Sequence, residues 1–123
     1  MKPGETVTAL IRANEARDVD AVIALLTDDV AYENVPIGVL TGHEEVRAML
    51  GPFLGGAERV EWEVLEQVEQ GEVVMNERVD RFWLPGDITI ELRVAGLFKV
   101  RDGQVALWRD YFDLAVFTEQ MNG

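Results

Sequence analysis

The chain has 123 residues, 48% of them hydrophobic, and this length predicts one domain spanning residues 1–123 around a single apolar core. Its formal net charge of −12 would repel phosphate backbones, so nucleic acid is not an expected partner. It contains no cysteine, no serine and only one histidine, which excludes disulfides, thiol and Ser-His nucleophiles and histidine-rich metal sites.

The sequence carries no signal for membrane attachment or export. It has no run of about 18 apolar residues and no basic segment followed by an apolar leader. We therefore expect no membrane span, no signal peptide and a cytoplasmic location.

Two amphipathic helices are predicted at the N-terminus. The first covers residues 3–17, because apolar residues recur there at helical spacing and Pro3 suits a first helical turn. Asp18 can cap a second helix. We expect that helix to end near residues 27–29, where two consecutive aspartates are typical of a turn.

A short strand and a third helix are predicted next. Residues 30–35 have the composition of a strand, which Pro36 and Gly38 would end. Thr41 followed by Glu44 is the pattern of a capping box, and the helix that it begins should end at the glycine pair 55–56. His43, in the first turn of this helix, is expected on the solvated surface.

Four longer strands follow, separated by turn residues that favour antiparallel neighbours. The predicted strands cover residues 60–68, 72–83, 88–100 and 104–112, and a short helical turn is expected at 115–120. Helices first and strands after them predict an α+β domain in which the helices pack on one face of a curved sheet. Such a sheet would enclose a pocket.

Polar residues fall on the predicted inward faces of three of the strands. Side chains alternate between the two faces of a strand, so a few positions fix each face. Strand 88–100 is the clearest guide, because its apolar residues alternate regularly with polar ones. The inward polar residues are Tyr32, Asn34, Arg78, Asp80 and Asp110.

If these residues lie together, the sum of their charges indicates how many protons the cluster binds. Two aspartates and one arginine sum to −1, and one bound proton makes the cluster neutral. Repulsion between the carboxylates would raise the pKa of one, while the shared arginine would hold the pKa of the other down. An acid and a base could then act together on water and a substrate, with no metal, cofactor or covalent intermediate.

A purely structural interpretation is also possible for each residue. Arg78 and Asp80 taken alone are more typical of a structural ion pair, and Tyr32 alone of a core tyrosine. Asp110 favours a site, because a carboxylate between Trp108 and Phe112 on an aromatic face requires a partner.

The pattern resembles the signature of the limonene-1,2-epoxide hydrolase family. Tyr32-x-Asn34, Arg78-x-Asp80 and the segment 108–113 match it in order and type, and the resemblance extends from about residue 10 to residue 117. It implies the cone-shaped α+β fold, with a mixed and mainly antiparallel sheet, that this family shares with ketosteroid isomerase and nuclear transport factor 2. It also implies a homodimer.

The resemblance implies one-step hydrolysis of a small apolar epoxide to a vicinal diol. Asp110 would be the general base, Tyr32 and Asn34 would position the water, Asp80 would be the general acid, and Arg78 would bridge the two carboxylates. The apolar wall that binds the substrate would consist of Phe82, Leu92, Val94, Phe112 and Phe117.

Two other functions remain open at this point. One is a proton-transfer enzyme similar to ketosteroid isomerase or a polyketide cyclase, in which one aspartate moves a proton next to a carbonyl. The other is a non-catalytic module that binds a small molecule or mediates dimerisation, because one fold hosts many functions.

Overall fold

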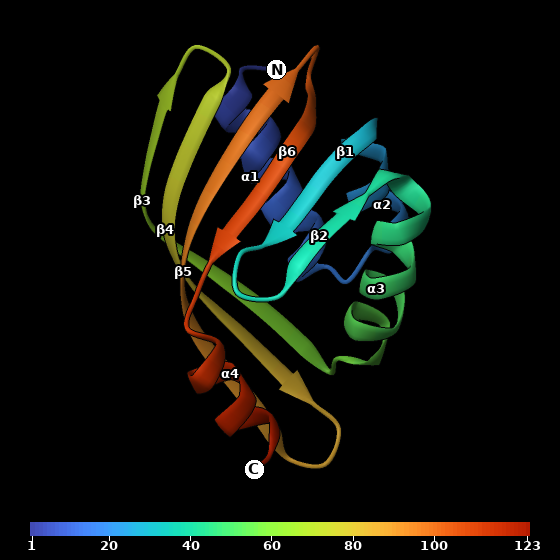
Figure 1. The fold of residues 1–123 in the computed structure, drawn as a ribbon, viewed down its shortest axis with the longest axis vertical. Helices are drawn as coiled ribbons and strands as arrows, with labels where there is room; N and C mark the ends of the chain where they lie inside the picture. The colour runs from blue at the N-terminus through green and yellow to red at the C-terminus, as the bar shows by residue number, and fades with distance from the viewer.

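A curved six-stranded sheet, with helices on one face, organises the computed structural model, which describes residues 1–123 (Figure 1). The elements in chain order are α1 (Pro3–Glu15), α2 (Val19–Ala24), β1 (Leu26–Asn34), β2 (Gly38–Thr41), α3 (Gly42–Gly56), β3 (Arg59–Gln70), β4 (Val73–Leu84), β5 (Ile88–Arg101), β6 (Gln104–Tyr111) and α4 (Leu114–Met121). In Figure 1, α1 crosses behind the sheet, α2 and α3 lie together at one side, and α4 follows β6 at the C-terminal end.

The strand order is β2-β1-β6-β5-β4-β3, so the last four strands in sequence form an antiparallel meander. β1 pairs with β6 in parallel, and β2 folds back antiparallel on β1. This confirms the predicted α+β class with a mixed, mainly antiparallel sheet. The tight turn between β5 and β6 has positive φ angles at Asp102 (53°) and Gly103 (79°), as a two-residue hairpin loop requires.

The alternation of side chains along β4 does not by itself show which face of the strand is buried. In the structure Val74, Asn76, Arg78 and Asp80 are buried, whereas Met75 is 48% exposed. The buried face of β4 continues the buried face of β5 and packs against the helices. Arg78 and Asp80 therefore point into the interior, as predicted.

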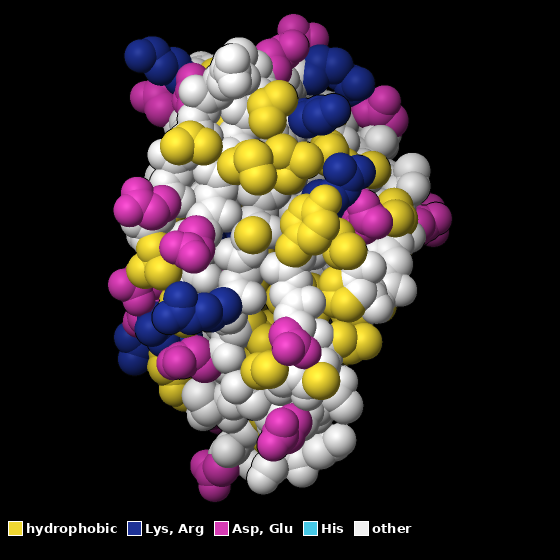
Figure 2. Space-filling model, turned by 60° about the vertical axis from the view of Figure 1, so that its left-hand side comes forward, with side chains coloured by type: hydrophobic (Ala, Val, Ile, Leu, Met, Phe, Trp, Pro, Cys, Tyr) yellow, Lys and Arg dark blue, Asp and Glu magenta, His cyan; other side chains and the backbone are white.

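The outer face of the sheet has no helix over it. Hydrophobic side chains gather there among basic and acidic ones (Figure 2). The exposed apolar residues of this face include Val39, Val68, Met75 and Tyr111.

Two predictions near the first strand were wrong. The second helix ends at Ala24, and the segment predicted as a turn, residues 27–29, lies within β1. The register between β1 and β6 shifts between Leu26 and Ala31. Asp28 and Asp29 lie within this irregular part of the strand and are exposed. Asp29 there forms an ion pair with Arg101 at 2.6 Å.

The start of the third helix also differs from the prediction. The Thr41 side chain makes no capping bond, and Glu45 rather than Glu44 accepts a hydrogen bond from the Thr41 main-chain nitrogen at 2.8 Å. The preceding strand β2 was not predicted. His43 is half-buried, and its Nε2 lies 2.9 Å from the Leu26 carbonyl oxygen, so it is not a free surface group.

The C-terminal helix is longer than predicted. It begins after Asp113, whose Oδ1 accepts hydrogen bonds from the main-chain nitrogens of Ala115 and Val116, and it extends to Met121. β6 ends at Tyr111, one residue before the predicted end. None of the helices combines the length and the apolar character that crossing a membrane would require.

Candidate active site

Arg78 lies at the centre of the buried polar cluster, with 0% of its surface exposed. Its Nε and Nη2 donate hydrogen bonds to Oδ1 and Oδ2 of Asp80, both at 3.0 Å. Its Nη1 donates to Asn76 Oδ1 at 2.9 Å. The guanidinium also lies over the Trp62 ring, 4.8 Å from the ring centroid. These contacts hold the cation in one orientation.

Asp110 approaches the same guanidinium from the other side. Its Oδ1 lies 3.1 Å from Arg78 Nη2, which makes an ion pair, but the two groups are not aligned for a hydrogen bond. Its Oδ2 accepts a hydrogen bond from Trp108 Nε1 at 3.1 Å. Asp110 Oδ1 is therefore a buried acceptor with no hydrogen-bond donor in the protein.

Strand register brings Tyr32 and Asn34 to Asp110. In the parallel pair β1 and β6, Asn34 is opposite Asp110 and Tyr32 is opposite Trp108. The Tyr32 ring stacks on Trp108 with 3.9 Å between centroids and 18° between planes. The structure thus brings all five polar residues singled out in the sequence to one region.

Gly96 makes the crossing from Arg78 to Asp110 possible, and sequence reasoning assigned it no role. It lies on β5 between Asn76 and Asp110 in the strand register. A Cβ at Gly96 would be 2.5 Å from Arg78 Nη1 and 2.8 Å from Asn76 Oδ1. The guanidinium therefore passes over a strand at the one position without a side chain.

We expect Gly96→Ala to displace the cation. An arginine tip can usually move at little cost, but here Asp80, Asn76 and Asp110 fix it, so overpacking should cost about 1–3 kcal/mol. Urea unfolding should show this loss, and turnover should fall with it. The matched control is Ala95→Gly on the opposite face of β5, which leaves the cluster untouched. Equal stability and activity in wild type and Gly96→Ala would contradict this role.

Burial and neighbouring charges shift the pKa values of three groups in the site. Burial raises the pKa of the Asp80 carboxyl to about 6, although the adjacent Arg78 acts to lower it. Burial also raises the pKa of the Tyr32 phenol well above its usual value, and the nearby charge of Asp110 adds to this. Burial disfavours the charged form of Arg78, but the charges of Asp110 and Asp80 outweigh it and raise its pKa further. The guanidinium and the phenol therefore keep their protons throughout the physiological range.

The polar cluster borders a cavity of about 150 Å³. The cavity is lined by Asn14, Tyr32, Asn34, Ile37, Met49, Leu50, Phe53, Leu54, Trp62, Asp80, Phe82, Leu92, Val94, Asp110, Phe112 and Phe117. All five residues predicted as its apolar wall are among them. Ile37, which is 63% exposed, marks the side open to solvent.

Asn14 and Trp62 line this cavity but were not predicted. The only signal for Trp62 was its place between glutamates on a strand whose polar residues face outward. Asn14 gave none, because asparagine near a helix end is usually a surface or capping residue.

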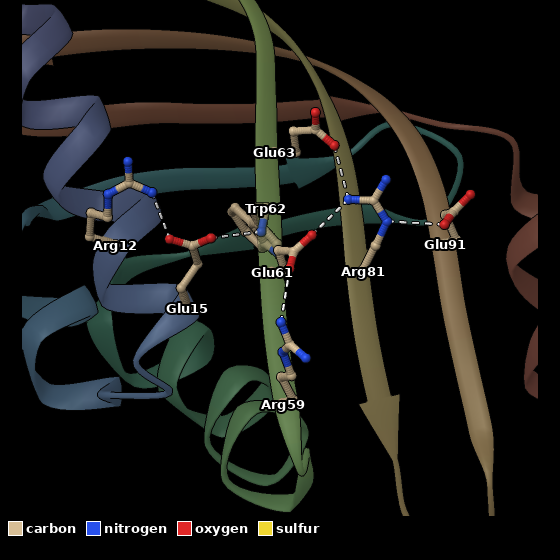
Figure 3. Close-up of polar contacts among 8 residues, drawn as sticks. All are labelled: Arg12, Glu15, Arg59, Glu61, Trp62, Glu63, Arg81 and Glu91. Atoms are coloured by element: carbon tan, nitrogen blue, oxygen red, sulfur yellow. Dashed lines mark hydrogen bonds and ion pairs between the residues drawn. The ribbon is translucent and has the colours of Figure 1, made fainter.

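Outside the cavity, Glu15 connects α1 to β3. Its carboxylate pairs with Arg12 at 2.8 Å and accepts a hydrogen bond from the Trp62 main-chain nitrogen at 3.0 Å (Figure 3). On the same strand, Glu61 shares Arg81 with two other glutamates (Figure 3). No group of three or more His, Cys, Asp or Glu side chains is placed to hold a metal ion.

Comparison with known proteins gives one family for this chain. The family model described as the limonene-1,2-epoxide hydrolase catalytic domain matches residues 1–122. Epoxide hydrolase EphG of Mycobacterium tuberculosis is 36% identical over 110 residues, which cover 88% of this chain and 71% of that protein.

Solved structures agree with this. An LEH-like epoxide hydrolase of M. tuberculosis superposes with a TM-score of 0.84 at 32% identity, covering 97% of this chain and 89% of that one. A protein from Catenulispora acidiphila with a ketosteroid isomerase-like fold has a TM-score of 0.84 at 23% identity, covering 99% and 95% of the two chains. The second similarity shows the fold alone.

Proposed function

The chain belongs to the limonene-1,2-epoxide hydrolase family, and on this premise we propose that it adds water to an epoxide in one step to give a vicinal diol. The observation that best supports the proposal is the Arg78 guanidinium, which contacts two buried carboxylates, Asp80 and Asp110, beside an apolar cavity. One carboxyl can act as an acid while the other acts as a base.

Asp110 activates the water. Its Oδ1 has a lone pair that no protein donor occupies, so it can accept a proton from a water molecule beside it. Tyr32 and Asn34 hold that water, since a phenol and an amide together offer donors and acceptors. As the water oxygen bonds to an epoxide carbon, its proton passes to Asp110.

Asp80 acts on the other oxygen. When the carbon–oxygen bond of the ring breaks, the electron pair goes to the epoxide oxygen, which takes the proton of the Asp80 carboxyl. Arg78 contacts both carboxylates and stays charged, so the cluster keeps its total charge while one carboxyl loses a proton and the other gains one. Proton exchange with solvent then restores the starting state.

The size of the cavity limits the reacting end of the substrate. An apolar cavity of about 150 Å³ holds a ligand of roughly benzene size. A small ring or a terminal epoxide fits this space, and a longer apolar substituent would extend toward Ile37. The substrate is therefore a small, mainly apolar epoxide.

The test is to incubate the protein with a panel of apolar epoxides in oxygen-18-labelled water and to analyse the diols by mass spectrometry. We expect one labelled oxygen in each diol. A proton-transfer enzyme of the same fold would turn over none of the panel, and a binding module would return the epoxides unchanged. Absence of turnover across the panel would overturn the proposal.

The role of Asp80 predicts a pH dependence. A general acid works only in its protonated form, so kcat/KM should decrease about tenfold per pH unit above the Asp80 pKa of about 6. A profile of kcat/KM against pH, measured in buffers with overlapping ranges, shows this decrease, which is the alkaline limb of the profile. Glu15→Gln is the informative variant, because the negative charge of Glu15 helps raise the pKa of Asp80, and the limb should move to lower pH. A flat profile from weakly acidic to alkaline pH would exclude Asp80 as the acid.

We also propose a homodimer formed through the outer face of the sheet. The strand register places Val68, Met75 and Leu97 side by side across that face, and two of them are 66% and 48% exposed. Such an apolar row is typical of a surface that another protein covers.

Light scattering after size exclusion should therefore give twice the mass of one chain. Met75→Lys should give the monomer, because two copies would bring lysines into an apolar contact. Val116→Lys is the control, since this residue is also exposed but belongs to α4, at the opposite end of the molecule from the turn that joins β3 and β4 (Figure 1), and it should leave the dimer intact. A monomeric wild type would contradict the proposal.

A further inference from the structure

Two buried polar atoms in the cavity wall have no part in the proposed reaction. Asn14 is 0% exposed and Trp62 is 5% exposed. Asn14 Oδ1 and Trp62 Nε1 both lack a hydrogen-bond partner, although both residues line the cavity. One is an acceptor and the other is a donor.

The orientation of the Asn14 amide follows from its neighbour. Its Nδ2 lies 2.8 Å from the Leu10 main-chain oxygen, which can only accept a hydrogen bond. The nitrogen must therefore face Leu10, and the carbonyl oxygen must be the free atom.

The two residues line the cavity from neighbouring elements, α1 and β3. Glu15, next to Asn14 at the end of α1, accepts a hydrogen bond from the Trp62 main-chain nitrogen on β3 at 3.0 Å (Figure 3). Trp62 is paired with Asp80 in the register of β3 and β4. Asp110 and the water-binding residues belong to β6 and β1, on the other side of β5 in the sheet. Trp62 is therefore the direct sheet neighbour of Asp80, the proposed acid.

Buried donors and acceptors without partners are costly, and in native proteins they usually find a ligand or a water molecule. An epoxide oxygen or a carbonyl could accept from Trp62 but could give nothing to Asn14. A hydroxyl group satisfies both, because it accepts a hydrogen bond and donates one.

We propose that Asn14 and Trp62 form a second polar subsite that binds a hydroxyl group of the substrate, so that the preferred substrates are epoxides with an apolar body and one hydroxyl. The inference rests on the proposed epoxide hydrolysis and names its substrate class. The hydroxyl accepts from Trp62 Nε1, donates to Asn14 Oδ1 and orients the ring so that the epoxide oxygen faces Asp80.

The kinetic test compares cyclohexene oxides that carry either a hydroxyl or a methyl group at the same ring carbon, over all ring positions. A methyl group has nearly the size of a hydroxyl but forms no hydrogen bond. Trp62→Phe removes the indole donor and keeps an aromatic ring. We expect the ratio of kcat/KM, best hydroxyl isomer over its methyl partner, to fall about tenfold in Trp62→Phe.

Phe53→Leu is the matched control, because it alters an apolar part of the same wall. It should change kcat/KM for both partners by the same factor. If the hydroxyl-to-methyl ratio is the same in wild type and Trp62→Phe, a water molecule fills the subsite and the proposal is overturned.

A binding experiment separates this inference from the proposed reaction. The Trp62 indole signal in a nitrogen-15 NMR spectrum is identified by its loss in Trp62→Phe, and the wild type is titrated with cyclohexanol and with methylcyclohexane. We expect cyclohexanol alone to move the signal downfield. This result supports the subsite even if no epoxide is hydrolysed, whereas an unmoved signal with cyclohexanol overturns it even if epoxides are hydrolysed.

Discussion

Replacing Asp110 by asparagine should reduce kcat/KM for epoxide hydrolysis by about 10²–10⁴-fold, the usual contribution of one general base. The substitution keeps the shape of the side chain and its acceptor for Trp108 Nε1, which donates to Oδ2 at 3.1 Å. It removes the ability of the other oxygen to take a proton from water. The measurement is the initial rate of labelled diol formation at a pH where Asp80 is protonated.

Asp113→Asn is the matched control for this variant. Asp113 lies close by in sequence, but its carboxylate only caps α4, and asparagine caps a helix equally well. Its rate should stay within about twofold of the wild type, as for other surface substitutions. If Asp110→Asn and Asp113→Asn hydrolyse epoxides equally fast, Asp110 is not the base.

The polar cluster could be predicted because it breaks the local pattern. Asp110 lies between Trp108 and Phe112 on one face of its strand, and buried charge at such a position requires a partner. Arg78 and Asp80 share a strand face with Val74 and Phe82 and supply such partners. The regular alternation of β5 decided which face was inside. The alternation of side chains along single strands was therefore enough to identify these residues, without knowledge of which strands pair.

Contacts between distant segments could not be predicted in the same way. The parallel pairing of β1 with β6 joins segments about 75 residues apart in the sequence. Parallel strands are not connected by a tight turn, so no turn residues predict this pairing. The role of Gly96 exists only because Arg78 crosses above it. The segment at residues 27–29 has turn composition, but it lies between Leu26 and Ala31, which both pair with β6, and it stays within β1. Local propensity is a weak guide where a distant strand supplies the hydrogen bonds.

Removing the central cation should have the largest effect on stability. Arg78→Met leaves Asp80 and Asp110 buried together with no positive charge, and breaking a buried ion pair in this way costs about 3–5 kcal/mol. Urea unfolding near neutral pH measures the loss. Arg101→Met is the control, because its ion pair with Asp29 is half-exposed and such pairs contribute at most about 1 kcal/mol. Equal losses in the two variants would show that the buried cation has no special role.

The pH dependence identifies the cause of this loss. In the wild type the folded-state pKa of Asp80, about 6, lies above its ordinary value of 3.8, so the folded state binds the proton more tightly and stability from this group falls as pH rises between the two values. Arg78 lowers the pKa of Asp80, so in its absence the decrease in stability should extend to higher pH. The stability that Arg78→Met loses relative to the wild type should therefore be smaller at acidic than at alkaline pH. Adding Asp80→Asn and Asp110→Asn to Arg78→Met removes the uncompensated charge and should recover part of the stability. If the triple variant is no more stable than Arg78→Met at alkaline pH, the loss comes from packing around the guanidinium and not from buried charge.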